Sequence, residues 1–262
     1  KAEVDARTAA QQALPKITPP IDAALPQQAT GVRPSRALPY ELHTSARSDS
    51  AGGRVQLLFA NSGKSAAVFH VYDKLHLADR LPRRFMVEPD KQLSDYWSAM
   101  TDDAGAYDLW VLGPNGYHRQ FKGNLNALRA GGAAVPEIRV GYDVRRGDVL
   151  LQLRNEGRRD CRFTVQANKA YPLPQLLGSA GHRNDHDGNN SGKGHGRDGD
   201  WSVRVNGGEE ATMRWNLESS GQWYDFSVTC DVDAAFYRRL AGRVETGRHA
   251  VSDPAMGMAD QF

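Results

Sequence analysis

Hydrophobic and polar residues alternate in short runs along most of the chain. Val55, Leu57 and Phe59 occupy every second position of one run, residues 61–63 are turn formers, and residues 68–72 form a second run rich in β-favouring side chains. Such runs, separated by turn residues, are typical of antiparallel sheets. No long segment of helical period follows residue 37. The pattern therefore predicts an all-β protein with little helix.

The chain repeats itself. Residues 53–63 (GRVQLLFANSG) return 94 residues later as residues 147–157 (GDVLLQLRNEG). The offset then widens, because residues 105–111 match 221–228 and residues 117–123 match 236–242. Self-similarity on this scale indicates duplicated structural units. We therefore expect two tandem, superposable antiparallel β-sandwiches of the immunoglobulin or fibronectin type, here called repeat 1 (residues 37–125) and repeat 2 (residues 135–247).

Matched alternating positions predict the core of each repeat. Eight positions of repeat 1 and their partners in repeat 2 should face inward: Val55, Leu57, Phe59, Phe69, Val71, Trp97, Leu109 and Val111, with Val149, Leu151, Leu153, Phe163, Val165, Trp215, Phe226 and Val228. The matched segments 61–63 (NSG) and 155–157 (NEG) are expected to be hairpin turns, because Asn and Gly tolerate positive φ. Residues 126–134 are expected to be a hinge between the repeats.

Three segments lie outside the repeated pattern. Residues 1–36 are predicted to be the end of a preceding domain and a Pro-rich linker, with a short Ala-rich helix within residues 1–14. A disordered chain end is the alternative for this segment. Residues 178–199 contain seven glycines and three histidines and are expected to be a low-complexity insertion in repeat 2. Residues 248–262 are expected to be a short polar tail.

Composition removes several classes of function. The chain of 262 residues is 40% hydrophobic and 24% charged, which is ordinary for a globular protein. A formal net charge of +2 does not favour a nucleic-acid binder. No apolar run approaches the length of a membrane span. The sequence begins without an initiator Met or a signal peptide, so we expect a piece of a longer protein.

Candidate chemistry is sparse. The sequence contains no G-x-S-x-G nucleophile motif, so we expect neither a catalytic residue nor a cofactor in this chain. His182, Asp185, His186 and Asp187 are the weak metal-binding candidates, but the glycines around them disfavour a helix that would align the histidines. A calcium loop with Gly188 at its sixth position would place Arg183 at its first position and Gly194 at its twelfth, and neither residue can ligate calcium through its side chain. A solvated loop without metal is the preferred interpretation.

The two cysteines, Cys161 and Cys230, both fall on predicted strands of repeat 2. A disulfide between them would suit a secreted protein and would stabilise the fold by roughly 2–4 kcal/mol. Two buried thiols that act as small apolar side chains are the alternative. Spacing does not decide between these states.

Three tryptophans have no aromatic partner in the other repeat. Trp110 and Trp223 occupy outward positions by strand alternation, and Trp201 is unmatched as well. Such side chains are candidates for contact with a lipid interface, a choline headgroup or another domain. The alternative is packing against the neighbouring repeat.

A family resemblance adds to this picture. Three strings, residues 38–43 (LPYELH), 57–63 (LLFANSG) and 107–123 (YDLWVLGPNGYHRQFKG), resemble the C-terminal domain of bacterial phosphocholine-preferring phospholipases C. The resemblance covers about residues 37–247. It implies a large N-terminal catalytic domain, similar to acid-phosphatase and alkaline-phosphatase-like hydrolases, followed by two tandem copies of a small β-rich domain.

The resemblance also carries expectations about function. The parent enzyme would hydrolyse phosphatidylcholine to diacylglycerol and phosphocholine, with sphingomyelin as a second candidate substrate, after export in the folded state to the periplasm or the extracellular space. This chain would be its non-catalytic accessory region, which stabilises the catalytic domain or assists contact with a lipid interface or a chaperone-like protein. A free-standing tandem adhesion or carbohydrate-binding module is the alternative.

Overall fold

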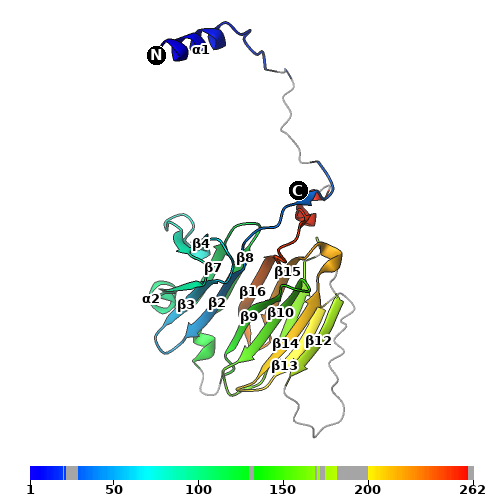
Figure 1. Ribbon diagram of the computed structural model, residues 1–262. Coiled ribbons are helices and arrows are strands. Elements are labelled where there is room, and N and C mark those ends of the chain that lie inside the picture. The colour runs from blue at the N-terminus through cyan, green and yellow to red at the C-terminus, as the bar shows by residue number, and fades with distance from the viewer. Residues whose placement is uncertain are drawn as a thin grey trace. The chain divides into compact units, whose positions relative to one another are not determined.

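The computed structural model describes residues 1–19, 21, 29–129, 133–168, 170–171, 175–181 and 200–258 (Figure 1). The chain divides into two compact units, Lys1–Thr30 and Gly31–Phe262. In the first unit, helix α1 spans Ala2–Gln12, close to the predicted segment. None of its side chains is buried, and its alanines supply the helix propensity. No helix among the described residues is long and apolar enough to cross a membrane.

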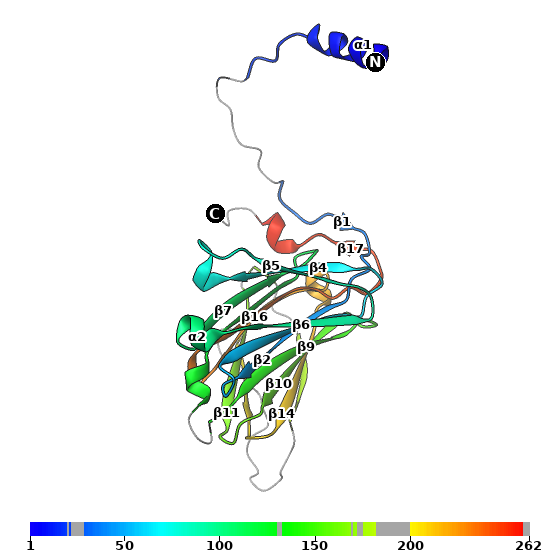
Figure 2. The ribbon, with the colours of Figure 1, turned by 90° about the vertical axis from the view of Figure 1, so that its left-hand side faces the viewer.

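The second unit is built mainly of strands (Figures 1 and 2). Repeat 1 contributes β2 (Leu42–Asp49), β3 (Arg54–Asn61), β4 (Ala67–Asp73), β5 (Arg83–Val87), β6 (Lys91–Trp97), β7 (Ala106–Leu112) and β8 (His118–Asn124). Repeat 2 contributes β9 (Pro136–Asp143), β10 (Asp148–Asn155), β11 (Cys161–Ala167), β12 (Gln175–Gly181), β13 (Asp200–Val205), β14 (Glu210–Asn216), β15 (Trp223–Cys230) and β16 (Asp233–Arg243).

Short elements complete the unit. They are α2 (Ala99–Asp103), the 3-10 helices η1 (Lys74–His76), η2 (Leu125–Leu128), η3 (Glu218–Ser220) and η4 (Pro254–Gly257), and the terminal strands β1 (Pro34–Ser35) and β17 (Ala250–Val251). Strand β1 pairs with β17, so residues 34–35 belong to the folded unit rather than to the predicted linker. The described part of the predicted polar tail likewise contains β17 and η4.

The strand pairing confirms the all-β, antiparallel sandwich prediction. In repeat 1 the sheet β2-β3-β6 faces strands β5, β4, β7 and β8, and in repeat 2 the sheet β9-β10-β14-β12 faces β13, β11, β15 and β16. The register repeats as well: Val55 pairs with Trp97 as Val149 pairs with Trp215. The two tryptophans therefore occupy equivalent positions.

Every residue predicted to lie in a core is buried in the structure. The buried side chains form two clusters, one in each repeat. The alternation of apolar side chains thus identifies the inner faces of both sandwiches, because successive side chains of a strand point to opposite faces of the sheet.

The predicted hairpin turns at residues 61–63 and 155–157 are wrong. Strand β3 and the following strand β4 lie in different sheets, so the chain crosses from one sheet to the other. The Asn61 side chain donates hydrogen bonds to the carbonyls of Ser65 and Val87 and accepts one from the Gly63 amide. A Cβ on Gly63 would lie 2.5 Å from the Pro39 carbonyl oxygen. Glycine is needed there for close backbone approach rather than for positive φ.

The corner of repeat 2 has the same design. Asn155 donates to the carbonyls of Arg159 and Val205 and accepts from the Gly157 amide. A Cβ on Gly157 would lie 2.1 Å from the Ala133 carbonyl oxygen. The repeated Asn-x-Gly string is therefore a sheet-crossing corner, in which a buried amide side chain satisfies backbone groups of the bend.

Two features distinguish the repeats. Strand β12 pairs with the outer edge of β14 and has no counterpart in repeat 1, where β6 is an edge strand. Because β12 extends to Gly181, the first four residues of the predicted insertion 178–199 belong to a strand; residues 182–199 lie outside the described part of the chain.

Strands β8 and β16 join the two repeats into one eight-stranded sheet, with β5 and β13 at its edges. In both views β2 and β9 lie side by side without a shared ladder (Figures 1 and 2).

Candidate functional site

The seam where β8 meets β16 contains the most unusual polar groups of the described structure. Arg119 on β8 and Arg238 on β16 occupy equivalent positions of the two repeats, and both are 0% exposed. Burial of a guanidinium, which stays charged in proteins, is costly unless its donors are paired. The partners of these two guanidinium groups therefore show how the two repeats are held together.

Arg119 reaches across the seam into repeat 2. One terminal nitrogen donates to the Ala241 carbonyl at 2.7 Å. The other donates to the hydroxyl oxygens of Tyr142 at 2.7 Å and Tyr224 at 2.8 Å. Its guanidinium also lies 4.2 Å from the ring centre of Tyr117, a favourable cation–π distance.

Arg238 makes the reciprocal contacts in repeat 1. It donates to the Lys122 carbonyl at 2.6 Å and to the Tyr107 hydroxyl at 3.1 Å. Its guanidinium lies 4.1 Å from the ring centre of Phe236. Lys122 matches Ala241, and Tyr107 matches Tyr224. The two arginines are thus related by an approximate twofold relation across the seam.

The relation fails at one position, where a charge is present on one side only. Arg238 also binds the Glu137 carboxylate at 3.4 Å, and the Ser48 hydroxyl donates to the same carboxylate. Burial raises the pKa of Glu137, and Arg238 opposes that shift. No ion pair of Arg119 occurs among the described residues: by strand register His43 occupies the position that Glu137 has in repeat 2, and Arg119 donates to the phenol oxygen of Tyr142 instead. One buried cation is neutralised and the other is solvated by neutral dipoles.

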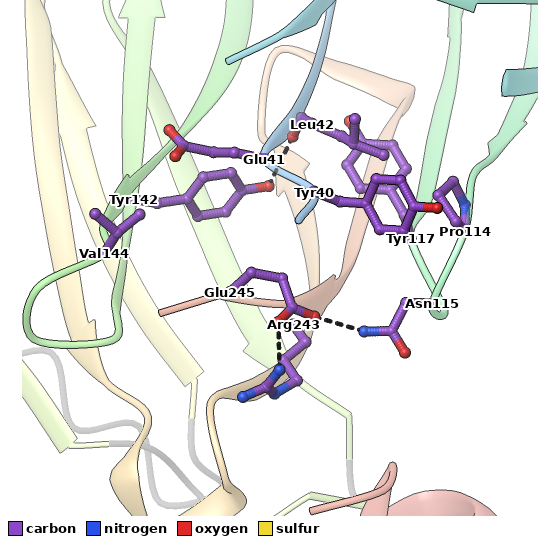
Figure 3. A pocket seen from close by; sticks show the side chains of 10 residues that line it. All are labelled: Tyr40, Glu41, Leu42, Pro114, Asn115, Tyr117, Tyr142, Val144, Arg243 and Glu245. Carbon is purple, nitrogen blue, oxygen red and sulfur yellow. Dashed lines mark hydrogen bonds and ion pairs between the residues drawn. The ribbon is translucent and has the colours of Figure 1, made fainter. Parts of the chain in front are cut away.

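A small pocket opens on the Arg119 side of the seam (Figure 3). It holds about 20 Å³ and lies between Tyr40, Glu41, Tyr117, Tyr142 and Glu245. Figure 3 shows Glu245 bound to Arg243 and to the Asn115 amide, and Tyr142 bound to the Leu42 carbonyl. This volume accommodates about one water molecule.

Burial keeps two phenols of this pocket, Tyr117 and Tyr142, neutral. Burial raises the pKa of Tyr117 to about 12, although Arg119 opposes the shift, and burial raises the pKa of Tyr142 as well. Neutral phenols act here as hydrogen-bond partners rather than as acids or bases at physiological pH. The pocket at the seam is too small for a phospholipid headgroup.

A candidate metal-ligand set lies in repeat 1, away from the seam, and sequence reasoning missed it. Ligand atoms of Asp73, His76 and Asp103 lie within 4.8 Å of one another. His76 is already bound to Asp103 at 2.7 Å, and Arg80 is bound to Asp73 at 3.0 Å. Hydrogen bonding to Asp103 raises the pKa of His76. His76 and Arg80 therefore already pair with these carboxylates.

The weak metal candidates His182, Asp185, His186 and Asp187 lie outside the described residues. The cysteine pair is described. Cys161 and Cys230 are both buried and free, and contact between the two thiols raises the pKa of Cys161 and lowers that of Cys230. The two thiols are therefore neighbours in the core of repeat 2.

The expected exposure of Trp223 is wrong, and the contact candidate Trp201 is buried as well. Trp223 is 5% exposed, because its indole nitrogen donates to the Val251 carbonyl on β17 and its ring lies against Gly116 of repeat 1. Trp201 belongs to the core of repeat 2, with its ring 5.4 Å from that of Trp215. Neither side chain offers a free surface. Trp110 is only partly buried and lies on the outer face of its sheet.

The geometry defines a tandem β-sandwich protein whose repeats are joined by a shared sheet and a buried arginine seam. The sequence profile of the bacterial phospholipase C C-terminal domain matches residues 34–124 and 136–243, in agreement with the two repeats. The chain belongs to this family.

Three relatives are phospholipases C. The chain is 40% identical over 257 residues to a non-hemolytic phospholipase C of Pseudomonas aeruginosa, covering 98% of this chain and 33% of the relative. It is 38% identical over 242 residues to a non-hemolytic phospholipase C of Burkholderia pseudomallei, covering 92% and 30%. A hemolytic phospholipase C of Pseudomonas aeruginosa is 34% identical over 256 residues, covering 90% and 31%. The chain spans about a third of the length of these relatives.

Proposed function

We propose that this chain is the non-catalytic accessory region of a secreted bacterial phospholipase C that hydrolyses phosphatidylcholine, with sphingomyelin as a second candidate substrate. The observation that carries the proposal is the seam. Its buried arginines, tyrosines and carboxylate bind one another and the backbone, and the pocket on the Arg119 side holds about 20 Å³. Groups bound in this way hold two repeats together, whereas catalysis needs a group that can reach a substrate.

The lengths of the relatives support an accessory role over a free-standing adhesion or carbohydrate-binding module. Roughly two thirds of each relative lies outside the part that matches this chain. In the proposed arrangement, a preceding domain carries the nucleophile and any metal ions, and this chain stabilises that domain or brings it to its lipid substrate.

Hydrolysis of p-nitrophenyl phosphocholine tests the proposal. The chain alone should release no nitrophenol above the background rate, with zinc, with calcium or with a chelator, while the longer protein should turn the ester over. Turnover that copurifies with the chain would contradict the accessory role. His76→Gln and Asp103→Asn variants would then show whether the candidate ligand set is responsible.

A further inference from the structure

The two repeats have equivalent cores, but the outer faces of their sheets differ in polarity. In repeat 1, Val68 pairs with Met86 across β4 and β5, and Tyr72 pairs with Trp110 across β4 and β7. Strand alternation and burial place these four side chains on the outer face of the sheet.

The equivalent pairs of repeat 2 are polar. Arg162 pairs with Arg204, and Gln166 pairs with Ser227. Because both repeats fold with the same core and register, the apolar outer face of repeat 1 is not required by the fold. A feature that the fold does not require points to an interaction.

The apolar face continues into the loop that joins β4 to β5. Leu77 is 55% exposed and Leu81 is 93% exposed, and Met86 on the edge strand β5 is 63% exposed. Residues 74–82 connect the ends of a hairpin, so Leu77 and Leu81 lie at its tip. Exposed apolar side chains in a hairpin loop are better suited to insertion among lipid acyl chains than to packing against a flat protein surface.

Cations flank this face. The Lys74 ammonium lies 4.1 Å from the ring centre of Trp110, and Arg84 is exposed beside His70 on the outer face. The acidic groups nearby already have cationic or histidine partners. Asp73 and Asp102 bind Arg80. Asp79 and Asp103 contact His76, and Asp95 binds Arg83. Among the described residues neither Lys74 nor Arg84 pairs with a carboxylate, so both cations are available to bind phosphate groups.

We propose that the β4–β5 hairpin of repeat 1, with Leu77 and Leu81 in its loop and Lys74 and Arg84 beside them, forms a docking surface for a phospholipid bilayer together with Trp110 on the neighbouring strand β7. This inference rests on the proposed function, whose substrate lies in such a bilayer. Leu77 and Leu81 enter the acyl boundary, the amphipathic rings of Trp110 and Tyr72 lie at headgroup level, and Lys74 and Arg84 contact lipid phosphates.

Vesicle sedimentation of the chain tests the surface without any hydrolysis. The probe is a vesicle of phosphatidylcholine mixed with phosphatidylglycerol. The double variant Leu77→Ser/Leu81→Ser should bind about tenfold more weakly or worse, because two leucine side chains lose their transfer from water. Lys74→Gln/Arg84→Gln should weaken binding by roughly fivefold per side chain at low salt, since each basic residue near an anionic surface contributes about that much.

Repeat 2 supplies the matched control. Leu177→Ser/Val232→Ser removes two exposed apolar side chains of similar size and should leave binding unchanged. The chain should also show a blue shift of tryptophan emission on binding, and Trp110→Phe should abolish most of it. Thermal unfolding of each variant establishes that the fold is intact.

Two outcomes would overturn the proposal. One is binding by Leu77→Ser/Leu81→Ser that equals binding by the unchanged chain. The other is absence of vesicle binding together with loss of stability of the longer protein on the same substitution, which would assign the hairpin to the catalytic domain. Neither outcome concerns hydrolysis by the chain itself, so the accessory function stands or falls separately.

Discussion

Repeat 1 and repeat 2 bury equivalent cores but differ at the seam and on their outer faces. At the seam, equivalent arginines meet different partners: Arg238 binds a carboxylate, and Arg119 binds phenols and carbonyls. On the outer face, repeat 1 is apolar and aromatic where repeat 2 is polar. Duplication therefore explains the strands and their register. The differences between the two repeats indicate where each repeat has a separate function.

The largest effect should come from breaking the seam at Arg238. Arg238→Met leaves the buried Glu137 carboxylate without its cation and should destabilise the chain by about 3–5 kcal/mol. Arg119→Met removes hydrogen bonds to neutral partners and should cost less, about 1–3 kcal/mol. Urea unfolding measures both free energies.

A double variant checks the assigned cause. Arg238→Met/Glu137→Leu removes both charges and should recover a large part of the stability that Arg238→Met loses. Equal losses for Arg238→Met and Arg119→Met, or no recovery in the double variant, would mean that the charge on Glu137 is not what distinguishes the two sides of the seam.

The pH dependence of stability should distinguish the repeats through His118, which matches Tyr237. Burial lowers the pKa of His118 to about 4, so below pH 6.5 the unfolded chain binds a proton that the folded chain rejects. Stability should therefore fall as the pH falls from about 6.5 to 4, by roughly 2–3 kcal/mol from this group.

The variant His118→Gln isolates this contribution, because the pKa of His43 is lowered as well and adds a background of the same sign. The unfolding free energy of the chain minus that of the variant should decrease as the pH falls, because only the chain carries His118. Tyr237→Phe is the matched control in repeat 2 and should leave the acid limb unchanged. A difference that is flat with pH would show that His118 is not held neutral by burial.

The crossing corners should respond alike in both repeats. Asn61→Ala removes hydrogen bonds to two backbone carbonyls and one amide, and Asn155→Ala removes hydrogen bonds to two backbone carbonyls and two amides, so each should cost about 1–3 kcal/mol. Asn206→Ala, at an exposed turn, serves as the control and should change stability by less than about 0.5 kcal/mol. Markedly unequal losses at Asn61 and Asn155 would break the equivalence of the two corners.

These corners also show how far sequence carries the fold. Alternation identifies the inner residues, because a strand presents every second side chain to one face. It does not say which strand is the neighbour, so residues 61–63 looked like a hairpin although they change sheets. Alternation likewise placed Trp223 outward, but β17, which is remote in sequence, covers it. Coverage by a distant segment leaves no periodic signal.

The seam was visible in the sequence only in part. Arg119 and Arg238 lie within the matched strings 117–123 and 236–242, so their equivalence was available. Their burial was not, since an arginine on a strand is usually exposed. A charged residue that recurs at the same position of both copies is the signal that would have identified them. The set Asp73, His76 and Asp103 carries no comparable signal, because η1 and α2 bring it together only in the folded chain.

The smallest effect on stability should follow from giving repeat 1 the outer face of repeat 2. Val68→Arg, Tyr72→Gln and Trp110→Ser introduce the residues that repeat 2 has at the equivalent positions. The summed loss of stability should stay within about 1–2 kcal/mol, because substitutions outside the core change stability little, and Trp110 and Tyr72 are only partly buried. In contrast, Trp215→Ala in the core should cost about 3–5 kcal/mol. Urea unfolding compares the two variants. A loss from the exchanged face as large as that from Trp215→Ala would make Trp110 and Tyr72 part of the folding core, and the difference between the outer faces would then reflect packing rather than recognition.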